Sequence, residues 1–290
     1  MKKNIILFFI CVFGFNTFGQ AGSLEYKGEY ASSVIGGYVR DAVFAHDTCY
    51  FISGDGNRIL MKRTNGGNLV NPFDGKVFHE ALKLCINNSH IIVLDLEKIR
   101  IYTKSGVLVR QIQLLQGILY YYFWVKGTTE IMLMSHSKVF VYNYNTGQLV
   151  AQKESTCSFD LSNFANNGQK FFYGGDRLMS YEYKNNAIIQ TDITTIKYSD
   201  YYSRDFHLAS CVNNQMLWFD FYKRDTLFVT DANFNAQIAT YPFFPISEKP
   251  TSDELYTESG DPNLDIIPSQ YANYVIKISE NKIKFYQLTL

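Results

Sequence analysis

The sequence is poor in proline, in cysteine and in net charge, and each shortage excludes a class of protein. Its 290 residues include six prolines and five cysteines, a cysteine content far below that of a disulfide-stapled domain. Lys+Arg and Asp+Glu number 27 each, which argues against a broadly basic nucleic-acid-binding surface and against an acidic tail. We therefore expect no nucleic acid among the partners.

Aromatic residues are abundant, by contrast. They make up 16% of the chain, with 22 Tyr, 23 Phe and 2 Trp, within a hydrophobic fraction of 47%. Tyr and Phe are enriched in strands and depleted in flexible tails. The composition predicts a large strand-rich interior.

The first twenty residues have the pattern of a secretory signal peptide. Lys2 and Lys3 precede an apolar run, Ile5–Phe15, and small residues at Thr17 and Gly19 offer a cleavage site before Gln20. The apolar core is short for a membrane span, and no later segment approaches that length. We expect residues 1–19 to be removed and the mature chain to be secreted or periplasmic; the alternative is a retained N-terminal anchor.

Four cysteines remain in the mature chain: Cys49, Cys85, Cys157 and Cys211. None belongs to a C-x-x-C motif, and their spacing does not suggest a zinc site. Two interpretations stay open, namely disulfide pairing in one of three connectivities or unpaired small residues within strands. The low density favours the second interpretation.

A short unit recurs along the chain with a period near forty residues. A basic or polar residue opens an alternating apolar stretch at Arg58, Lys98, Lys138, Arg177, Thr226 and Lys282. Eight or nine residues after each of the first five starts stands a residue that tolerates positive φ: Gly66, Gly106, Gly147, Asn185 and Asn235. Apolar strands and polar turns flank each unit, so each unit predicts four short antiparallel strands.

Six four-stranded units predict a six-bladed β-propeller, an all-β fold. The last unit ends at Leu290 after its third strand, and the segment Leu24–Tyr30 stands before the first unit. We expect this N-terminal strand to complete the last blade and close the ring, which removes exposed sheet edges. Residues 20–290 would then form a single domain.

The segment from Ile91 to Ile112 carries the clearest family resemblance. An apolar strand, Asp95, the alternating stretch Lys98–Tyr102 and Gly106 follow one another there. This arrangement resembles one repeat of the six-bladed propellers of secreted bacterial proteins, the NHL-like and TolB-like group. The resemblance implies that fold, in a group that includes binding modules, scaffolds and a minority of enzymes, and it implies no site residue.

Residues that face the channel of such a propeller form the candidate ligand-binding site. Counting back from the unit starts to the first strand of each blade identifies a level at the channel mouth occupied by Asp41, Glu80, Tyr121, Asp160, Asp205 and Asp265. Basic and imidazole side chains stand beside these positions at Arg40, His79, Arg204 and His207. Such a ring could hold a cation, with Ca²⁺ as the candidate, or a cationic group of a ligand. Alternatively, the Asp residues cap turns by accepting backbone N–H groups.

The regular pattern lapses over residues 244–268, between the fifth and sixth units. Four prolines and six acidic residues occur there, which predicts a long irregular loop. Such a loop is either a binding loop or a solvated insertion. In the first case, Tyr256 is the residue expected to contact a ligand.

No serine-hydrolase elbow, metalloprotease motif, P-loop or dinucleotide-binding motif occurs in the sequence. We expect a monomeric, non-catalytic binding or scaffold module for a protein, peptide or glycan, without a cofactor. The alternative is a hydrolase or lyase that uses channel-mouth carboxylates with a bound divalent cation, because paired carboxylates from distant blades leave no local motif.

Overall fold

The computed structural model describes an all-β chain. The residues described are Val70, Phe73, Phe78 and the ranges 23–31, 39–45, 48–53, 59–63, 80–157, 164–174, 178–193, 206–212, 215–220, 223–231, 237–242, 264–267, 273–278 and 282–289. These residues form strands, turns and bends, and none of them lies in a helix. Within them there is accordingly no helix that could cross a membrane. The predicted signal peptide lies outside the described residues.

The described strands form six antiparallel sheets, of which five have four strands and one has three. The three-stranded sheet contains β2 (Val39–Ala45), β3 (Thr48–Ser53) and β4 (Ile59–Arg63). The following sheet contains β5 (Ala81–Ile86), β6 (His90–Asp95), β7 (Lys98–Thr103) and β8 (Leu108–Gln113). The third contains β9 (Tyr120–Lys126), β10 (Glu130–Ser135), β11 (Lys138–Asn143) and β12 (Leu149–Glu154).

The second half of the chain continues in the same order. One sheet contains β13 (Phe164–Asn166), β14 (Phe171–Tyr173), β15 (Met179–Lys184) and β16 (Ala187–Asp192). The next contains β17 (Phe206–Val212), β18 (Gln215–Asp220), β19 (Lys223–Asp231) and β20 (Gln237–Pro242). The remaining sheet contains β21 (Leu264–Ile267), β22 (Asn273–Ile278), β23 (Lys282–Thr289) and β1 (Ser23–Ala31).

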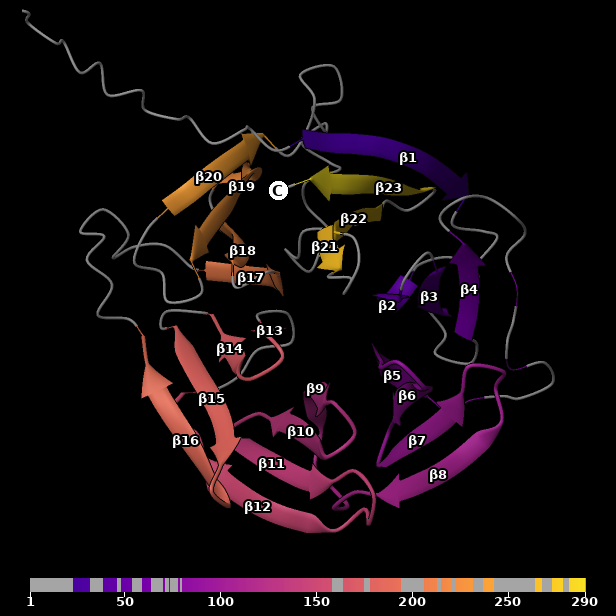
Figure 1. The fold of residues 1–290 in the computed structure, drawn as a ribbon, viewed down its shortest axis with the longest axis vertical. Coiled ribbons are helices and arrows are strands. Elements are labelled where there is room, and N and C mark those ends of the chain that lie inside the picture. The colour runs from indigo at the N-terminus through magenta and orange to yellow at the C-terminus, as the bar shows by residue number, and fades with distance from the viewer. Residues whose placement is uncertain are drawn as a thin grey trace, which may run out of the picture.

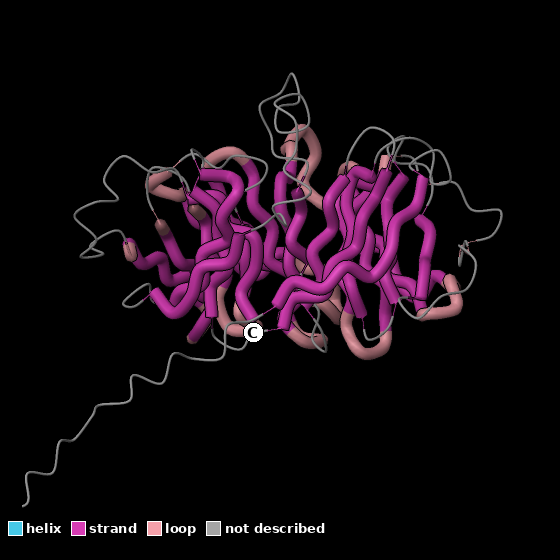
Figure 2. The backbone as a smooth tube through the Cα atoms, turned by 90° about the horizontal axis from the view of Figure 1, so that it is seen from above, coloured by secondary structure: helices cyan, strands magenta, loops and turns pink. Residues whose placement is uncertain are grey.

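The sheets stand around a common centre, as the blades of a propeller do (Figure 1). The strands nearest the centre are β2, β5, β9, β13, β17 and β21, whereas β1, β8, β12, β16 and β20 lie on the perimeter. Seen from the side, the strands cross the thickness of a flat disc (Figure 2). The arrangement is consistent with a β-propeller, and it brings the inner strands of neighbouring sheets together, such as β2 with β5 and β17 with β21.

Residues from the two ends of the chain share one sheet. β1 pairs antiparallel with β23, from Ser23 opposite Thr289 to Ala31 opposite Lys282. The segment Leu24–Tyr30, which the sequence predicts as a strand of the last unit, lies within β1. The stretch 244–268, predicted to be irregular, includes β21 near its end; residues 243–263 lie outside the described part of the chain.

The core lies between adjacent sheets rather than within one of them. One cluster joins Ile92 and Ile99 to Phe123 and Phe140 of the next sheet. Second strands are therefore covered on both faces, and β6 is buried at each position from Ile91 to Asp95. The outer strand β12 is mostly exposed. Continuous apolar runs such as Ile91–Leu94 reflect this two-sided burial.

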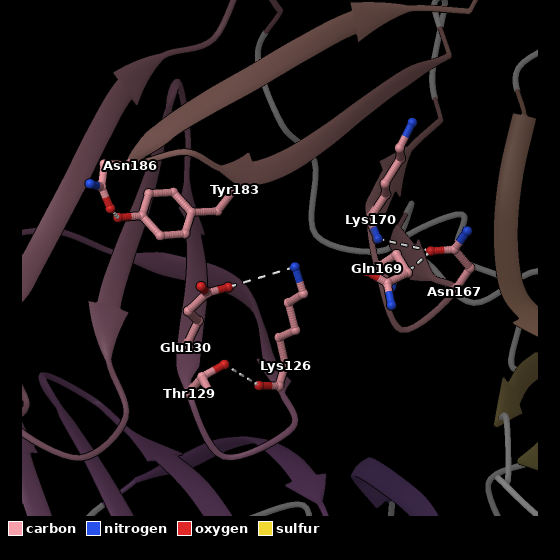
Figure 3. A network of polar contacts seen from close by, with 8 residues as sticks. All are labelled: Lys126, Thr129, Glu130, Asn167, Gln169, Lys170, Tyr183 and Asn186. Carbon is pink, nitrogen blue, oxygen red and sulfur yellow. Dashed lines mark hydrogen bonds and ion pairs between the residues drawn. The ribbon is translucent and has the colours of Figure 1, made fainter.

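Asparagine side chains hold the hairpin turns. Oδ1 of Asn167 accepts the backbone N–H groups of Gln169 and Lys170 at 3.1 and 2.8 Å (Figure 3). Oδ1 of Asn87 and Oδ1 of Asn143 accept backbone N–H groups two and three residues further on in the same way. An Asn side chain that replaces a backbone acceptor stabilises a tight turn. This explains why Asn recurs between the predicted strands.

Bulges occur repeatedly in the inner and outer strands. In β2, Val39 pairs with Ser53 and Asp41 with Ile52, so Arg40 is the extra residue. Leu82 in β5 and Tyr121 in β9 are the corresponding extra residues. In the outer strands, the extra residues include Val109 in β8 and Val150 in β12. A bulge bends its strand and changes which side chains face the neighbouring sheet.

Candidate functional site

The structure describes the side chains of two of the predicted site residues, Asp41 and Glu80. It gives strand positions for four others, namely Arg40 in β2, Tyr121 in β9, His207 in β17 and Asp265 in β21. The remaining five lie outside the described residues: His79, Asp160, Arg204, Asp205 and Tyr256. The geometry of the candidate site is therefore built on β2, β5 and β9.

Strand register does not place the described candidates at one level. Val39, Ala81 and Tyr120 occupy equivalent positions, because they pair with Ser53, Asp95 and Ser135 at the ends of three second strands. Counted from these equivalent positions, Asp41 is two residues further along its strand, at the same level as Lys83 and Tyr122. Glu80 lies one residue before Ala81. Tyr121 lies one residue after Tyr120, at the level of Arg40.

Turn lengths explain two of the three residues by which Asp41 and Glu80 differ in level. Six residues separate Ile52 from its partner Ile59, whereas four separate Leu94 from Ile99. The same count back from Arg58 therefore reaches a position in β2 that is two residues further along the strand than the position that a count from Lys98 reaches in β5. Because side chains alternate between the faces of a strand and each bulge adds a residue, small offsets decide which groups meet.

The carboxylate of Asp41 links two inner strands. Its Oδ2 accepts the backbone N–H of Leu84 in β5 at 2.6 Å. Its Oδ1 lies 3.5 Å from Nζ of Lys83, and the Asp41 side chain is 16% exposed. Asp41 therefore accepts a backbone N–H, but from within a strand of the neighbouring sheet and not from a turn, so this contact differs from the turn-capping role that the sequence left open.

A second buried carboxylate, Asp95, fixes the start of β5. Its Oδ1 accepts the backbone N–H of Glu80 at 2.8 Å, and its Oδ2 forms a 2.9 Å ion pair with Arg100. The Asp95 side chain is 1% exposed. In return, the carbonyl of Glu80 accepts the N–H of Leu96 at 3.3 Å. Sequence reasoning missed this cluster. A signal was visible, because Asp95 directly precedes a predicted turn and Arg100 follows five residues later.

A further side-chain link joins β9 to β13. Asn166 donates through Nδ2 to the Tyr122 hydroxyl at 3.1 Å, and the Tyr122 ring stacks on Phe164 at a centroid distance of 4.7 Å. Burial raises the pKa of Tyr122 above its ordinary value, although the bond with Asn166 lowers it. The hydroxyl therefore stays protonated at physiological pH.

The cysteine thiols near Asp41 are poor nucleophiles. Burial raises the pKa of Cys85 to about 11, and the Asp41 carboxylate adds to this increase. Burial likewise raises the pKa of Cys49 well above its ordinary value. Reactive thiols have a lowered pKa. Cys49, Cys85 and Cys157 are free, as the unpaired interpretation expects.

The side chain of Lys104 lies near Cys85 and Tyr50. Its Nζ is 5.8 Å from the centroid of the Tyr50 ring, a cation–π distance. Burial lowers the pKa of Lys104. Within the residues described, no three His, Cys, Asp or Glu side chains gather as a metal site.

Comparisons with known proteins identify similar folds. No known sequence family and no curated protein matches the chain. A chain in the crystal structure of a mitotic checkpoint complex is 9% identical with a TM-score of 0.59, over 100% of each chain. The luciferin-regenerating enzyme is 11% identical with a TM-score of 0.59, over 93% of this chain and 96% of that one.

A chain of a nidogen–laminin complex is 10% identical with a TM-score of 0.50, over 70% of this chain and 79% of that one. Propeller-like folds, including the WD40 type, are thus similar to this structure. At these identities the similarity shows the fold alone.

Proposed function

We propose that the protein is a non-catalytic binding or scaffold module for a protein, peptide or glycan, built as a closed six-bladed propeller. The six radial sheets and the pairing of β1 with β23 support the blade count and the closure. The repeat from Ile91 to Ile112 supports a place in the NHL-like and TolB-like group. The basic and apolar start of the chain supports export of residues 20–290 after cleavage before Gln20. We propose that the exported protein is a monomer.

The binding role rests mainly on the engagement of Asp41. A general acid or base must present its carboxyl group to a substrate. The two oxygens of Asp41 instead contact the Leu84 amide and the Lys83 ammonium. This carboxylate therefore serves to hold the inner strands together, so that they form a rigid frame for contacts with a partner.

The test of this proposal is Asp41→Asn, with Lys83→Ala as the control variant. We expect Asp41→Asn to lower the melting temperature, because an amide oxygen is a weaker acceptor for the Leu84 N–H. Lys83→Ala should change it little, because the Lys83 side chain is 31% exposed and exposed pairs contribute about 0–1 kcal/mol. Neither wild-type nor variant protein should gain stability from CaCl₂.

The contrary result is equally clear. A cation held by Asp41 at 100 times its Kd would stabilise the wild type by about 2.7 kcal/mol. If CaCl₂ raises the melting temperature of the wild type and not that of Asp41→Asn, the carboxylate is a cation ligand. The purely structural role proposed for Asp41 then fails, and the argument from Asp41 against a carboxylate-dependent hydrolase or lyase fails with it.

A further inference from the structure

The second strands of two consecutive sheets begin with a polar residue that faces the next sheet. β6 begins with His90, and β10 begins with Glu130. Two positions further along, Ile92 packs against the third sheet and Met132 packs against the sheet of β13–β16. Side chains two residues apart lie on the same face of a strand, so His90 and Glu130 face these same neighbouring sheets.

A tyrosine of the neighbouring sheet occupies the equivalent position at each of these two interfaces. Tyr144 directly follows the third strand β11, and Tyr183 lies in the third strand β15. Each comes two residues after a tyrosine that pairs with the apolar start of a second strand, Ile131 in β10 and Phe171 in β14. Tyr144 and Tyr183 therefore occupy equivalent positions in consecutive sheets.

The hydrogen bonds of the two corresponding pairs differ. At the first interface, Nδ1 of His90 lies 3.0 Å from the Tyr144 hydroxyl, and this hydrogen bond joins the two sheets. At the second, the Tyr183 hydroxyl donates to Oδ1 of Asn186 in its own sheet, at 3.4 Å. Oε2 of Glu130 is buried and accepts no hydrogen bond from the residues that the structure describes. Buried polar atoms are almost always hydrogen-bonded, so this oxygen marks a place where a donor of a ligand can bind.

Lys126 forms an ion pair with this oxygen but is too distant to donate a hydrogen bond to it. Lys126 Nζ and Glu130 Oε2 are 3.9 Å apart (Figure 3). Polar atoms more than about 3.5 Å apart are often bridged by an oxygen atom that bonds to both. The two side chains are 24% and 23% exposed. Oε2 itself is buried, so a ligand reaches it when the flexible Lys126 side chain moves aside.

The chemistry of this ion pair selects a neutral hydroxyl group. A carboxylate only accepts hydrogen bonds, and an ammonium group only donates them. A hydroxyl group does both, so it can accept from Lys126 while it donates to Glu130. A cationic ligand would instead meet the charge of Lys126, and an anionic ligand would meet the charge of Glu130. Either ligand would be repelled at these distances.

The Tyr183 ring adds an apolar surface to the same interface. It is partly buried against the core cluster that contains Met132, two residues along β10 from Glu130. Figure 3 shows the ring above the Glu130 side chain. An aromatic ring with a few placed polar groups is typical of sites for small organic ligands. A sugar fits this combination, because it has an apolar C–H face and hydroxyl groups at its edge.

We propose that Lys126, Glu130 and Tyr183 form a binding site for a neutral sugar unit of a glycan, between the third sheet and the sheet of β13–β16. The proposal rests on the binding role above and specifies its ligand class. The sugar ring packs on Tyr183, and one of its hydroxyl groups bridges Lys126 and Glu130. The site uses none of the predicted channel-mouth residues.

The experiment is a glycan array probed with the protein expressed from the full chain. The array carries neutral glucan, mannan and galactan oligosaccharides beside carboxylated and sulfated ones. The neutral oligosaccharide with the strongest signal is then titrated by isothermal calorimetry to measure its Kd. We expect neutral glycans to bind and the binding to be insensitive to salt, because the ligand has no net charge.

Substitutions at the three residues test the contacts one by one. Glu130→Gln and Lys126→Met should each weaken binding about tenfold, because each removes a hydrogen bond to a charged group. Tyr183→Ala should weaken binding by a similar factor through the lost ring contact. Tyr183→Phe keeps the ring and should leave the Kd unchanged, because the Tyr183 hydroxyl bonds to Asn186.

The preceding interface supplies the matched control. Tyr144→Phe removes a hydroxyl group at the position equivalent to Tyr183 and breaks the bond with His90. It should lower the melting temperature and leave the Kd unchanged. Glu130→Gln should show the opposite result, a weaker Kd at an unchanged melting temperature, because Oε2 accepts no hydrogen bond from the described residues.

Four outcomes would overturn the inference. If only carboxylated or sulfated glycans bind, the ligand class is wrong. If a neutral glycan binds Glu130→Gln and Tyr183→Ala as tightly as the wild type, the sugar binds elsewhere on the protein. If no glycan binds but a peptide array yields a ligand, the sugar site fails and the general binding role stands. If neither array yields a ligand, the proposed binding function fails as well.

Discussion

The buried ion pair between Asp95 and Arg100 gives the sharpest test of how the inner strands are held. The Asp95 side chain is 1% exposed and the Arg100 side chain 23% exposed. Asp95→Ala would leave the Glu80 N–H without its 2.8 Å acceptor and Arg100 without its 2.9 Å partner. Asp95→Asn would remove the charge but keep an oxygen for the Glu80 N–H.

The expected losses in the free energy of unfolding follow from these two contacts of Asp95. Removing one partner of a buried pair costs about 3–5 kcal/mol, and the partial exposure of Arg100 favours the lower value for Asp95→Ala. Asp95→Asn should cost about 1–2 kcal/mol, because a hydrogen bond to a charged group is worth more than a neutral one. Arg100→Met keeps apolar packing, leaves the Asp95 charge uncompensated, and should cost about 2 kcal/mol.

Urea unfolding followed by tyrosine and tryptophan fluorescence measures each free energy. The double variant Asp95→Asn with Arg100→Met should lose less stability than the sum of the single variants, with a coupling of about 1–2 kcal/mol. Additive losses would show that the two side chains do not interact. A loss below about 1 kcal/mol for Asp95→Ala would refute the argument that this carboxylate fixes the start of β5.

Two further predictions concern alkaline pH and backbone conformation. Because the pKa of Cys85 is raised from 9.0 to about 11, the unfolded chain loses this proton at lower pH than the native protein. Stability should therefore fall as pH rises from about 9 to 11, and Cys85→Ala should flatten that slope in urea midpoints. Gly147→Ala should cost about 1–3 kcal/mol, because φ is +74° and the new Cβ would lie 3.2 Å from Ile112 Cγ1. Gly168→Ala, at φ +81° with nothing within 4 Å, should cost less in thermal unfolding; equal losses would contradict the packing contribution.

The strands were predictable because alternation and turn chemistry are local. The predicted stretch Lys98–Tyr102 is β7 but for one residue, and the apolar strand predicted before Asp95 is β6. The predicted positive φ at Gly147 and Asn185 is present, at 74° and 53°. Each of these features depends on a few neighbouring residues, so a single sequence suffices to predict it.

The candidate site was far less predictable, because it depends on distances between strands. The level of Asp41 relative to Glu80 depends on turn lengths and bulges, and the sequence alone does not mark the extra residue Arg40 as a bulge. The bond from Asp41 to the Leu84 amide joins two sheets and depends on how far apart they stand. A local clue existed for Asp95, which directly precedes a predicted turn and is followed by Arg100 five residues later.

The antiparallel ladder of β1 and β23 has a consequence for biogenesis. Ser23 lies opposite Thr289, 266 positions away along the chain, and closing so long a loop is entropically costly and slow. During synthesis, β1 has no partner strand until residues 282–289 leave the ribosome. A nascent chain thus carries an unpaired strand for nearly the whole of translation, and this segment is where a chaperone would bind to the greatest benefit.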